Sequence, residues 1–98
     1  MSRRLVFSPA ALRQYKKLPA RARALLKSTI AQCLLQEDPT LEDRNRFRLH
    51  RASVYADYEL RVDVWRVFYR VQVQRVVVEL IGRKDGNRVI IEGQEFEL

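Results

Sequence analysis

The chain has 98 residues, 47% of them hydrophobic, and its 19 lysines and arginines outnumber its 12 acidic residues, for a formal net charge of +7. This predicts one globular domain over residues 1–98. The single cysteine and single histidine exclude a disulfide framework, a cysteine-based zinc ribbon, a CxxC redox pair and a multi-histidine metal site. No apolar run approaches the ~18 residues of a membrane span, and the N-terminus lacks a signal-peptide core, so we expect a cytoplasmic domain without a membrane partner.

A strand and two helices are predicted in the N-terminal half. In residues 3–7, Leu5 and Phe7 alternate with Arg4 and Val6, which is typical of a short strand. Ser8 and Pro9 predict a helix start, because serine is a good N-cap and proline fits the first helical position. This helix ends at Pro19, and a second one extends to about Gln36, so the tight connection predicts an αα-hairpin. The apolar stripe of the second helix consists of Ala22, Leu26, Ile30, Cys33 and Leu34.

The C-terminal half is predicted to be a sheet. Residues 37–45 form a loop, after which the spacing of apolar residues changes from 3.6 to 2. The links near Asp63 and Gln74 are too short for a helical crossover, so the strands should pair as an antiparallel meander. The expected fold is α+β, with two N-terminal helices packed on a mainly antiparallel sheet in the order β-α-α-β-β-β. The predicted strands after the loop cover residues 46–50, 57–62, 65–73, 75–81 and 89–91.

Alternation assigns the side chains of the central strands to two faces. The face toward the helices is expected to carry Leu60, Trp65, Val67 and Tyr69. The opposite face is expected to carry Glu59, Arg61, Arg66, Phe68 and Arg70. Arginine favours bidentate contact with phosphate, which predicts an anion-binding face. The alternative is a solvated face with cross-strand ion pairs, such as Glu59 with an arginine.

Positive charge is concentrated in the first part of the chain. Residues 1–36 contain eight lysines and arginines and no acidic residue, since Glu37 is the first. A one-sided positive field favours an anionic partner. The alternative interpretation is a solvated helix surface.

The segment Glu59–Val71, with the sequence ELRVDVWRVFYRV, resembles the central hairpin of the RelE/ParE superfamily of toxins from type II toxin–antitoxin pairs. In that family the hairpin reads E-L-R, a short turn, then aromatic-R-V-x-Y. The Leu18-Pro19 helix break, the Asp38-Pro39 loop and the Gly82-Arg83-Lys84 turn match the family in order and spacing. The tail over residues 86–93 resembles a RelE-type branch.

This resemblance implies a RelE/ParE-like fold and one of two activities. RelE-like members cleave mRNA in the ribosomal A site, whereas ParE-like members inhibit DNA gyrase and are not nucleases. Both are neutralised by an antitoxin whose extended or helical segment wraps the toxin. The expected partners are therefore a cognate antitoxin with an acidic or amphipathic segment, the ribosome and mRNA, and no cofactor or metal is expected.

The resemblance also assigns cationic residues to a catalytic site. Cleavage of RNA by 2′-hydroxyl attack needs a base, cations for the phosphorane charge and an acid for the leaving 5′-oxygen, and it requires no metal. Arg66 matches the strand arginine that contacts the scissile phosphate, and Arg61 matches the arginine of the E-L-R strand. Lys84, beside Arg83, lies where RelE-like toxins have a catalytic arginine.

The base is the position at which the chain departs from the family. The paired catalytic lysines of RelE would fall at Asp57 and Glu59, and its C-terminal tyrosine would fall near Ile90. Glu59 and His50 are the candidate bases instead. His50 shares the register of Arg46 and Arg48, which predicts that it lies on the arginine face; the alternative is a surface histidine. The residues expected to contact RNA are Arg46, Arg48, Arg70, Lys16, Lys17, Arg21 and Arg23.

Three functions remain open from the sequence. The first hypothesis is a RelE-type toxin that acts as a ribosome-dependent mRNA endonuclease and represses translation. The second is a ParE-like toxin directed at gyrase, or a catalytically degenerate one. The third is a basic nucleic-acid-binding module without toxicity.

Overall fold

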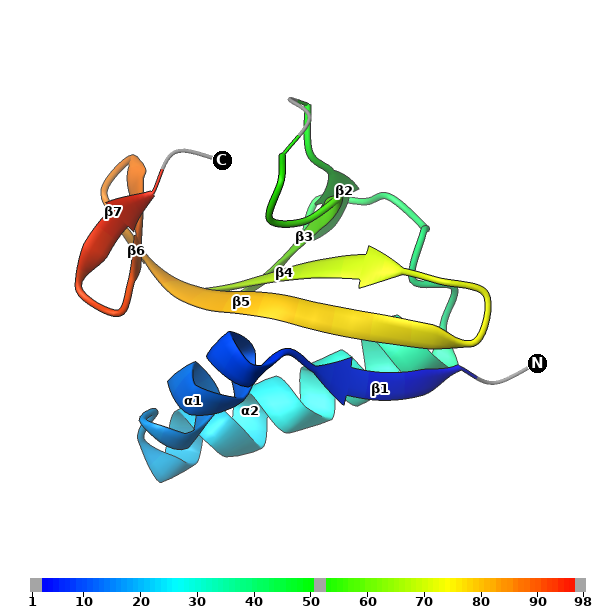
Figure 1. Ribbon diagram of the computed structural model, residues 1–98, viewed down its shortest axis with the longest axis horizontal. Coiled ribbons are helices and arrows are strands. Elements are labelled where there is room, and N and C mark those ends of the chain that lie inside the picture. Colours follow the sequence, from blue (N-terminus) through cyan, green and yellow to red (C-terminus); the bar gives the residue numbers. More distant parts are fainter. Residues whose placement is uncertain (1–2, 51–52, 97–98) are drawn as a thin grey trace.

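The computed structural model describes residues 3–50 and 53–96 as helices on one side of a twisted sheet (Figure 1). The N-terminal elements are β1 (Arg4–Phe7), α1 (Pro9–Lys16), α2 (Ala20–Ile30) and η1 (Ala31–Gln36). The remaining strands are β2 (Arg46–Arg48), β3 (Tyr58–Val62), β4 (Trp65–Val71), β5 (Arg75–Asp85), β6 (Arg88–Ile91) and β7 (Gln94–Phe96). In these residues no helix is long and apolar enough to cross a membrane.

The two helices form as the capping residues predict. The Ser8 hydroxyl accepts a hydrogen bond from the Ala11 amide at 3.0 Å, and Pro9 is the first residue of α1. Pro19 directly precedes α2, so the αα-hairpin is confirmed. The second helix reaches Gln36, but its last six residues are π-helical, which the apolar spacing did not reveal.

The strands pair mainly antiparallel, as expected, and form a seven-stranded sheet in the described residues. The order is β2-β3-β4-β5-β6-β7, while β1 pairs with β5 in parallel. The long β5 has two partners on one edge, because β1 pairs with its first residues and β6 with its last. The predicted order β-α-α-β-β-β omits strands, and β7 was not anticipated. It follows a turn in which Glu92 and Gly93 both have positive φ, and a non-glycine residue in that conformation gives no clear signal in sequence.

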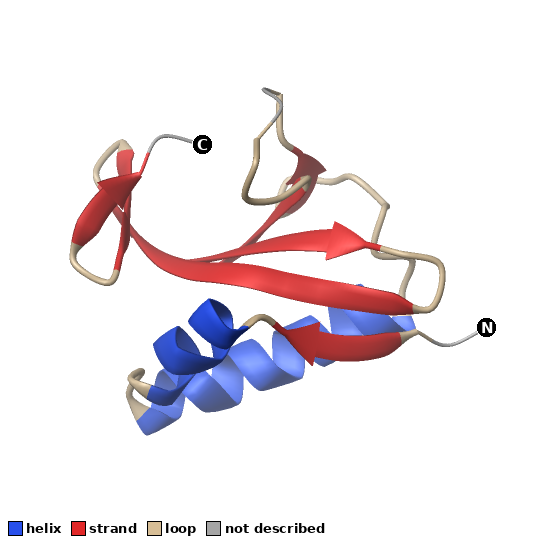
Figure 2. Cartoon of the chain, viewed as in Figure 1, coloured by secondary structure: helices blue, strands red, loops and turns tan. Residues whose placement is uncertain are grey.

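The main core lies between the helices and one face of the sheet (Figure 2). Leu26, Ile30 and Leu34 pack there against Leu60 and Tyr69, and all five side chains are buried. The predicted inward face is therefore confirmed, and the half-buried Trp65 packs at its margin.

A second, smaller core lies on the opposite face, where we expected only polar residues and Phe68. Phe68 is fully buried, together with Ala56 and Ile91. The β6–β7 hairpin and the chain before β3 both rise from this face (Figure 1). They cover its apolar centre, so the expectation of an open face that includes Phe68 was wrong.

Candidate functional site

A shallow hollow of about 310 Å³ opens on this face, where β3, β4 and the β5–β6 turn meet. We call it the arginine hollow. Its lining includes four cationic side chains and one carboxylate, from Arg61, Arg66, Lys84, Arg88 and Glu59. Gly86 and Asn87 of the β5–β6 turn also line the hollow.

Strand register explains why these residues meet. Arg61 is opposite Arg66 in the β3–β4 pair, and Arg66 is opposite Gly82 in the β4–β5 pair. Glu59 and Lys84 lie two residues away from Arg61 and Gly82 along their own strands, which places all of these side chains on one face.

Gly82 allows the side chains of β6 to lie close to the backbone of β5 beside the hollow. A Cβ atom at this position would lie 2.7 Å from Val89 Cγ1 and 2.8 Å from Ile91 Cγ1. Any side chain would therefore push β6 away. The glycine thus helps to bring Asn87 and Arg88 to the rim, and neither residue was predicted for the site; the only sequence signal was a charged turn.

Glu59 holds the two arginines of the hollow together. Its Oε2 atom lies 3.1 Å from Arg61 Nε and 3.8 Å from Arg66 Nε. Arg66 Nη1 also donates hydrogen bonds of 2.8 Å to the backbone oxygens of Asp63 and Trp65. Arg66 is therefore fixed in position, whereas Arg61 and Lys84 are exposed and can adjust to a ligand.

Burial changes the electrostatics of Arg66. Only 7% of this residue is exposed, and 9% of Glu59. Burial, followed by the positive charge of Arg61, lowers the pKa of Arg66, while Glu59 opposes that change. A phosphate group would add negative charge beside the guanidinium groups of Arg61 and Arg66.

The His50 ring contacts Phe47, whose ring lies beside Arg61 of the hollow. The Arg61 guanidinium lies 4.8 Å from the centroid of the Phe47 ring, and the His50 ring stacks on Phe47 at 6.3 Å. Phe47 is opposite Glu59 in the β2–β3 pair, so it belongs to the face of the hollow. The alternation that placed Arg46, Arg48 and His50 on the arginine face had predicted the opposite face for Phe47.

The predicted phase of β2 was therefore wrong. Arg46 is opposite Leu60 and points to the helical side, where it is 4% exposed. Its guanidinium bonds to Glu37, to Asp43 and to the Cys33 carbonyl, at 2.6, 3.2 and 2.7 Å. Arg46 thus joins η1 to β2, and we leave it out of the proposed RNA contacts.

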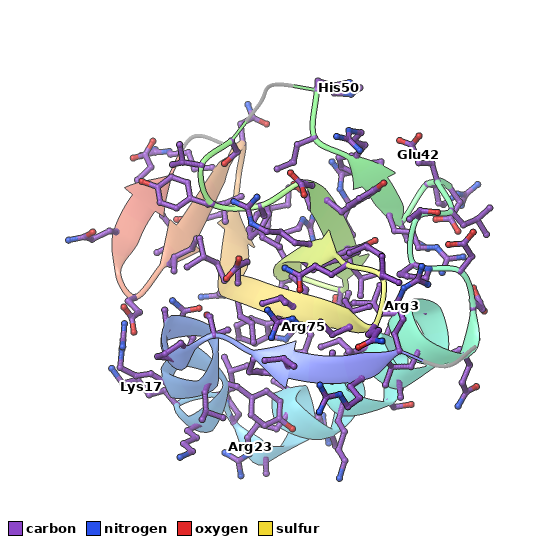
Figure 3. The ribbon with its side chains drawn as sticks, turned by 45° about the vertical axis from the view of Figure 1, so that its right-hand side comes forward. Arg3, Lys17, Arg23, Glu42, His50 and Arg75 are labelled. Atoms are coloured by element: carbon purple, nitrogen blue, oxygen red, sulfur yellow. The ribbon has the colours of Figure 1, made fainter. Side chains whose placement is uncertain are left out.

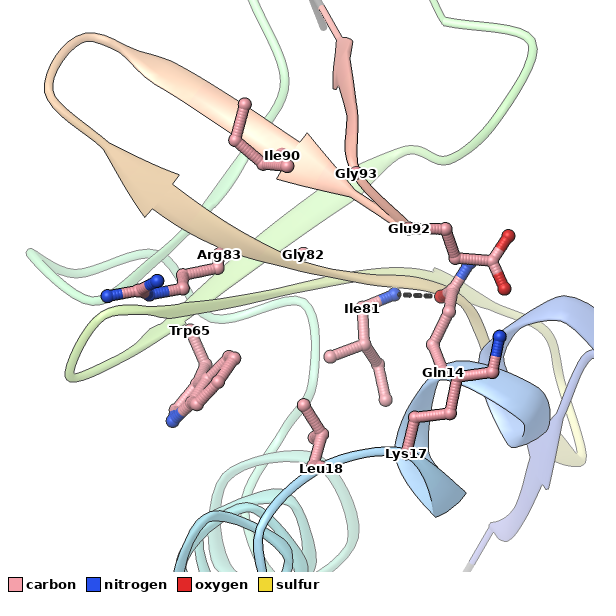
Figure 4. A pocket seen from close by; sticks show the side chains of 10 residues that line it. All are labelled: Gln14, Lys17, Leu18, Trp65, Ile81, Gly82, Arg83, Ile90, Glu92 and Gly93. Atoms are coloured by element: carbon pink, nitrogen blue, oxygen red, sulfur yellow. Dashed lines mark hydrogen bonds between the residues drawn. The ribbon is translucent and has the colours of Figure 1, made fainter.

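Three other predicted residues lie outside the hollow. Arg48 stacks over the Tyr58 ring at 5.5 Å. Arg70 pairs with Glu79 at 3.0 Å and with Asp57 at 3.6 Å. Arg83 points to the helical side, where it lines a pocket of about 220 Å³ beside Trp65 (Figure 4).

The helical cations form a separate surface. Figure 3 shows Lys17 and Arg23 on the helical side and His50 at the far end of the molecule. Arg23 Nη1 donates to the Leu18 carbonyl at 2.6 Å, which supports the connection between the helices. Lys16 and Arg21 are exposed on the same hairpin. These four cations are therefore remote from Glu59 and Arg66.

The hollow can bind an anionic group and accept a proton. Arginine and lysine side chains suit a phosphate, and a carboxylate beside them can act as a base. In the described part of the chain, no group of three or more histidine, cysteine, aspartate or glutamate side chains could hold a metal ion.

A family model matches most of the chain. The model describes the ParE toxin of a type II toxin–antitoxin system, parDE, and it matches residues 5–87. This range includes both helices, the central strands and all the residues of the hollow except Arg88 and Val89. A comparison with curated proteins gave no match.

Proposed function

This chain belongs to the ParE toxin family of type II toxin–antitoxin systems, and we propose that it arrests growth by cutting mRNA on the ribosome, which represses translation. The observation that carries the proposal is the contact of Glu59 with Arg61 and Arg66 in an open hollow that also has Lys84 on its wall. These residues supply the base and the cations that RNA cleavage by 2′-hydroxyl attack requires.

The proposed reaction uses the substrate's own hydroxyl as the nucleophile. Glu59 takes the proton of the 2′-hydroxyl, and the 2′-oxygen attacks the neighbouring phosphorus. Arg66 and Arg61 stabilise the negative charge of the phosphorane. The bond from phosphorus to the 5′-oxygen then breaks, and this oxygen takes a proton from Lys84. The products are a 2′,3′-cyclic phosphate and a free 5′-hydroxyl.

The two acidic residues at the family's lysine positions differ in their surroundings. The carboxylate of Asp57 pairs with Arg70, away from the hollow, whereas that of Glu59 lines the hollow. Ile90 lines the pocket beside Trp65 on the other side of the sheet. Glu59 is therefore the base in this proposal, because His50 stacks on Phe47 and does not line the hollow.

Primer extension on a reporter transcript tests the proposal. Induction of the chain in growing cells should produce new 5′ ends at codon-defined positions, and a drug that blocks translation initiation should abolish them. Arg66→Ala should produce none, and Arg75→Ala, at the far end of the sheet, should cut like the natural chain. Growth arrest with intact transcripts would overturn the proposal.

A gyrase-directed toxin is the second candidate function. Two observations favour it. The matching family model describes ParE toxins, and the carboxylate of Glu59 is already paired with Arg61 and Arg66. This function predicts filamentous cells and a DNA-damage response with intact mRNA. The same induced cultures, examined by microscopy and with a DNA-damage reporter, distinguish the two functions.

A further inference from the structure

Three stacked side chains connect the arginine hollow to the surface beside it. The guanidinium of Arg61, which lines the hollow, lies 4.8 Å from the centroid of the Phe47 ring. The His50 ring stacks on Phe47, with ring centroids 6.3 Å apart and an angle of 21° between the ring planes. We call Phe47 and His50 the stacked rings. Through Arg61 they are in contact with the cationic lining of the hollow.

The end of β2 determines where His50 lies. β2 ends at Arg48, so the next residues no longer have to alternate between the two faces of the sheet. The backbone amide of Leu49 donates to the Asp57 carbonyl at 2.9 Å, which fixes the chain directly before His50. His50 can therefore stack on Phe47, although strict alternation would place the two side chains on opposite faces.

The stacked rings lie outside both cores of the described residues. Neither Phe47 nor His50 packs in the main core or in the second, smaller core. His50 is exposed (Figure 3), and Phe47 is half-buried. In the described part of the chain, the His50 imidazole makes no hydrogen bond or ion pair. Its ring is therefore available to an external ligand.

This combination of cations and rings is typical of a site for single-stranded RNA. Such sites hold phosphate groups with arginine and lysine and stack unpaired bases on aromatic rings, histidine included. Here Arg61 belongs to both parts, because it lines the hollow and also contacts Phe47. A strand whose phosphate lies against Arg61 can therefore extend over the stacked rings.

We infer that the stacked rings bind one base of the mRNA close to the phosphate that is cut, with this base on the ring of His50. The inference rests on the proposed endonuclease function and adds to it a contact that positions the strand. Every base has a π-face, so the contact fixes the strand without selecting one base. This role needs the ring of His50 and not its nitrogen atoms, which distinguishes it from the role of a general base.

The experiment measures cleavage of a reporter mRNA on translating ribosomes by the purified chain at increasing concentration. His50→Ala should raise the concentration that gives the half-maximal rate by about tenfold and leave the maximal rate within about twofold, because it removes one stacking contact. His50→Phe keeps a ring and should cut like the natural chain. Val54→Ala is the matched control, because Val54 is 84% exposed in the same loop, and it should change neither quantity.

Circular dichroism checks that the variants fold. His50→Leu, which has bulk but no ring, keeps the test decisive if His50→Ala fails to fold. An unchanged half-maximal concentration in His50→Ala would overturn the inference and leave the proposed function standing. An equal loss of maximal rate in His50→Ala and His50→Phe would also overturn it, because His50 would then transfer a proton. A natural chain that cuts no mRNA would overturn the inference together with the function on which it rests.

Discussion

The carboxylate of Glu59 lies 3.8 Å from Nε of Arg66 on the adjacent strand, and both residues are less than a tenth exposed. Arg61 contacts the same carboxylate oxygen from the solvent side. An incoming phosphate must therefore compete with Glu59 for the arginines, and its arrival would free the carboxylate to accept a proton.

Arg66→Ala should abolish growth arrest and also lower stability. The change removes the proposed phosphate contact. It also leaves Glu59 short of a partner and two backbone oxygens without their donor, at a cost of about 1–3 kcal/mol. Expression plates and thermal melts followed by circular dichroism measure both effects. A folded variant that remains fully toxic would remove Arg66 from the site.

Glu59→Gln tests the proposed base with almost no change in shape. Loss of general-base catalysis should slow RNA cleavage by about 10²–10⁴-fold. Removal of the negative charge should at the same time strengthen phosphate binding by the arginines. Asp57→Asn is the matched control, because Asp57 pairs with Arg70 outside the hollow. Equal cleavage by both variants would reduce Glu59 to an ion-pair residue.

Gly82→Ala should displace β6 and thereby disturb the rim of the hollow. The new Cβ would lie within 3 Å of side-chain atoms of both Val89 and Ile91, so β6 must shift. We expect a loss of about 1–3 kcal/mol in the free energy of unfolding. Urea denaturation measures this loss. Gly86→Asn is the control, because space around Gly86 is open and asparagine tolerates its positive φ; a similar loss in both variants would contradict the steric explanation.

Tyr69 should make stability fall at high pH. Its ring is fully buried, and its hydroxyl donates to the Pro39 carbonyl at 2.8 Å. Burial raises the pKa of Tyr69 above the ordinary value, so the unfolded chain ionises first and folding weakens as pH rises above about 10.

Tyr69→Phe should cost about 1 kcal/mol near neutral pH, through the lost hydrogen bond, and less above pH ~10. Urea midpoints of both proteins across this pH range give the difference. A constant difference would show that Tyr69 does not contribute to the alkaline loss of stability.

Association with the partner should become slower as salt increases. The Debye length falls from ~10 Å at 0.1 M to ~3 Å at 1 M, which screens steering by the acid-free helical surface. Apolar contacts with the partner should keep the dissociation rate nearly constant. Stopped-flow fluorescence of Trp65, the only tryptophan, can follow the reaction. An association rate indifferent to salt would indicate that the basic surface faces away from the partner.

The sequence alone determined the helices, the central strands and the inward face of the sheet. These features depend on local rules. Ser8 caps the amide of Ala11 and Pro9 fits the first position of the helix, and alternation places Leu60 and Tyr69 on one face. The pairing of Glu59 with an arginine was also foreseeable as an alternative. Glu59 and Arg61 lie two residues apart on one strand, and the short turn of the hairpin places Arg66 opposite Arg61.

Only the tertiary structure decided which residues share the site. Arg46 and Phe47 lie on the faces opposite to those expected, because the phase of a three-residue strand is set by its partner β3. The bonds of the buried Arg46 to Glu37 and Asp43 hold it there. Arg88 reached the hollow because Gly82 lets β6 cross β5 closely. Phe68 was buried because distant segments fold over the sheet, and alternation along a strand carries no information about what covers each face.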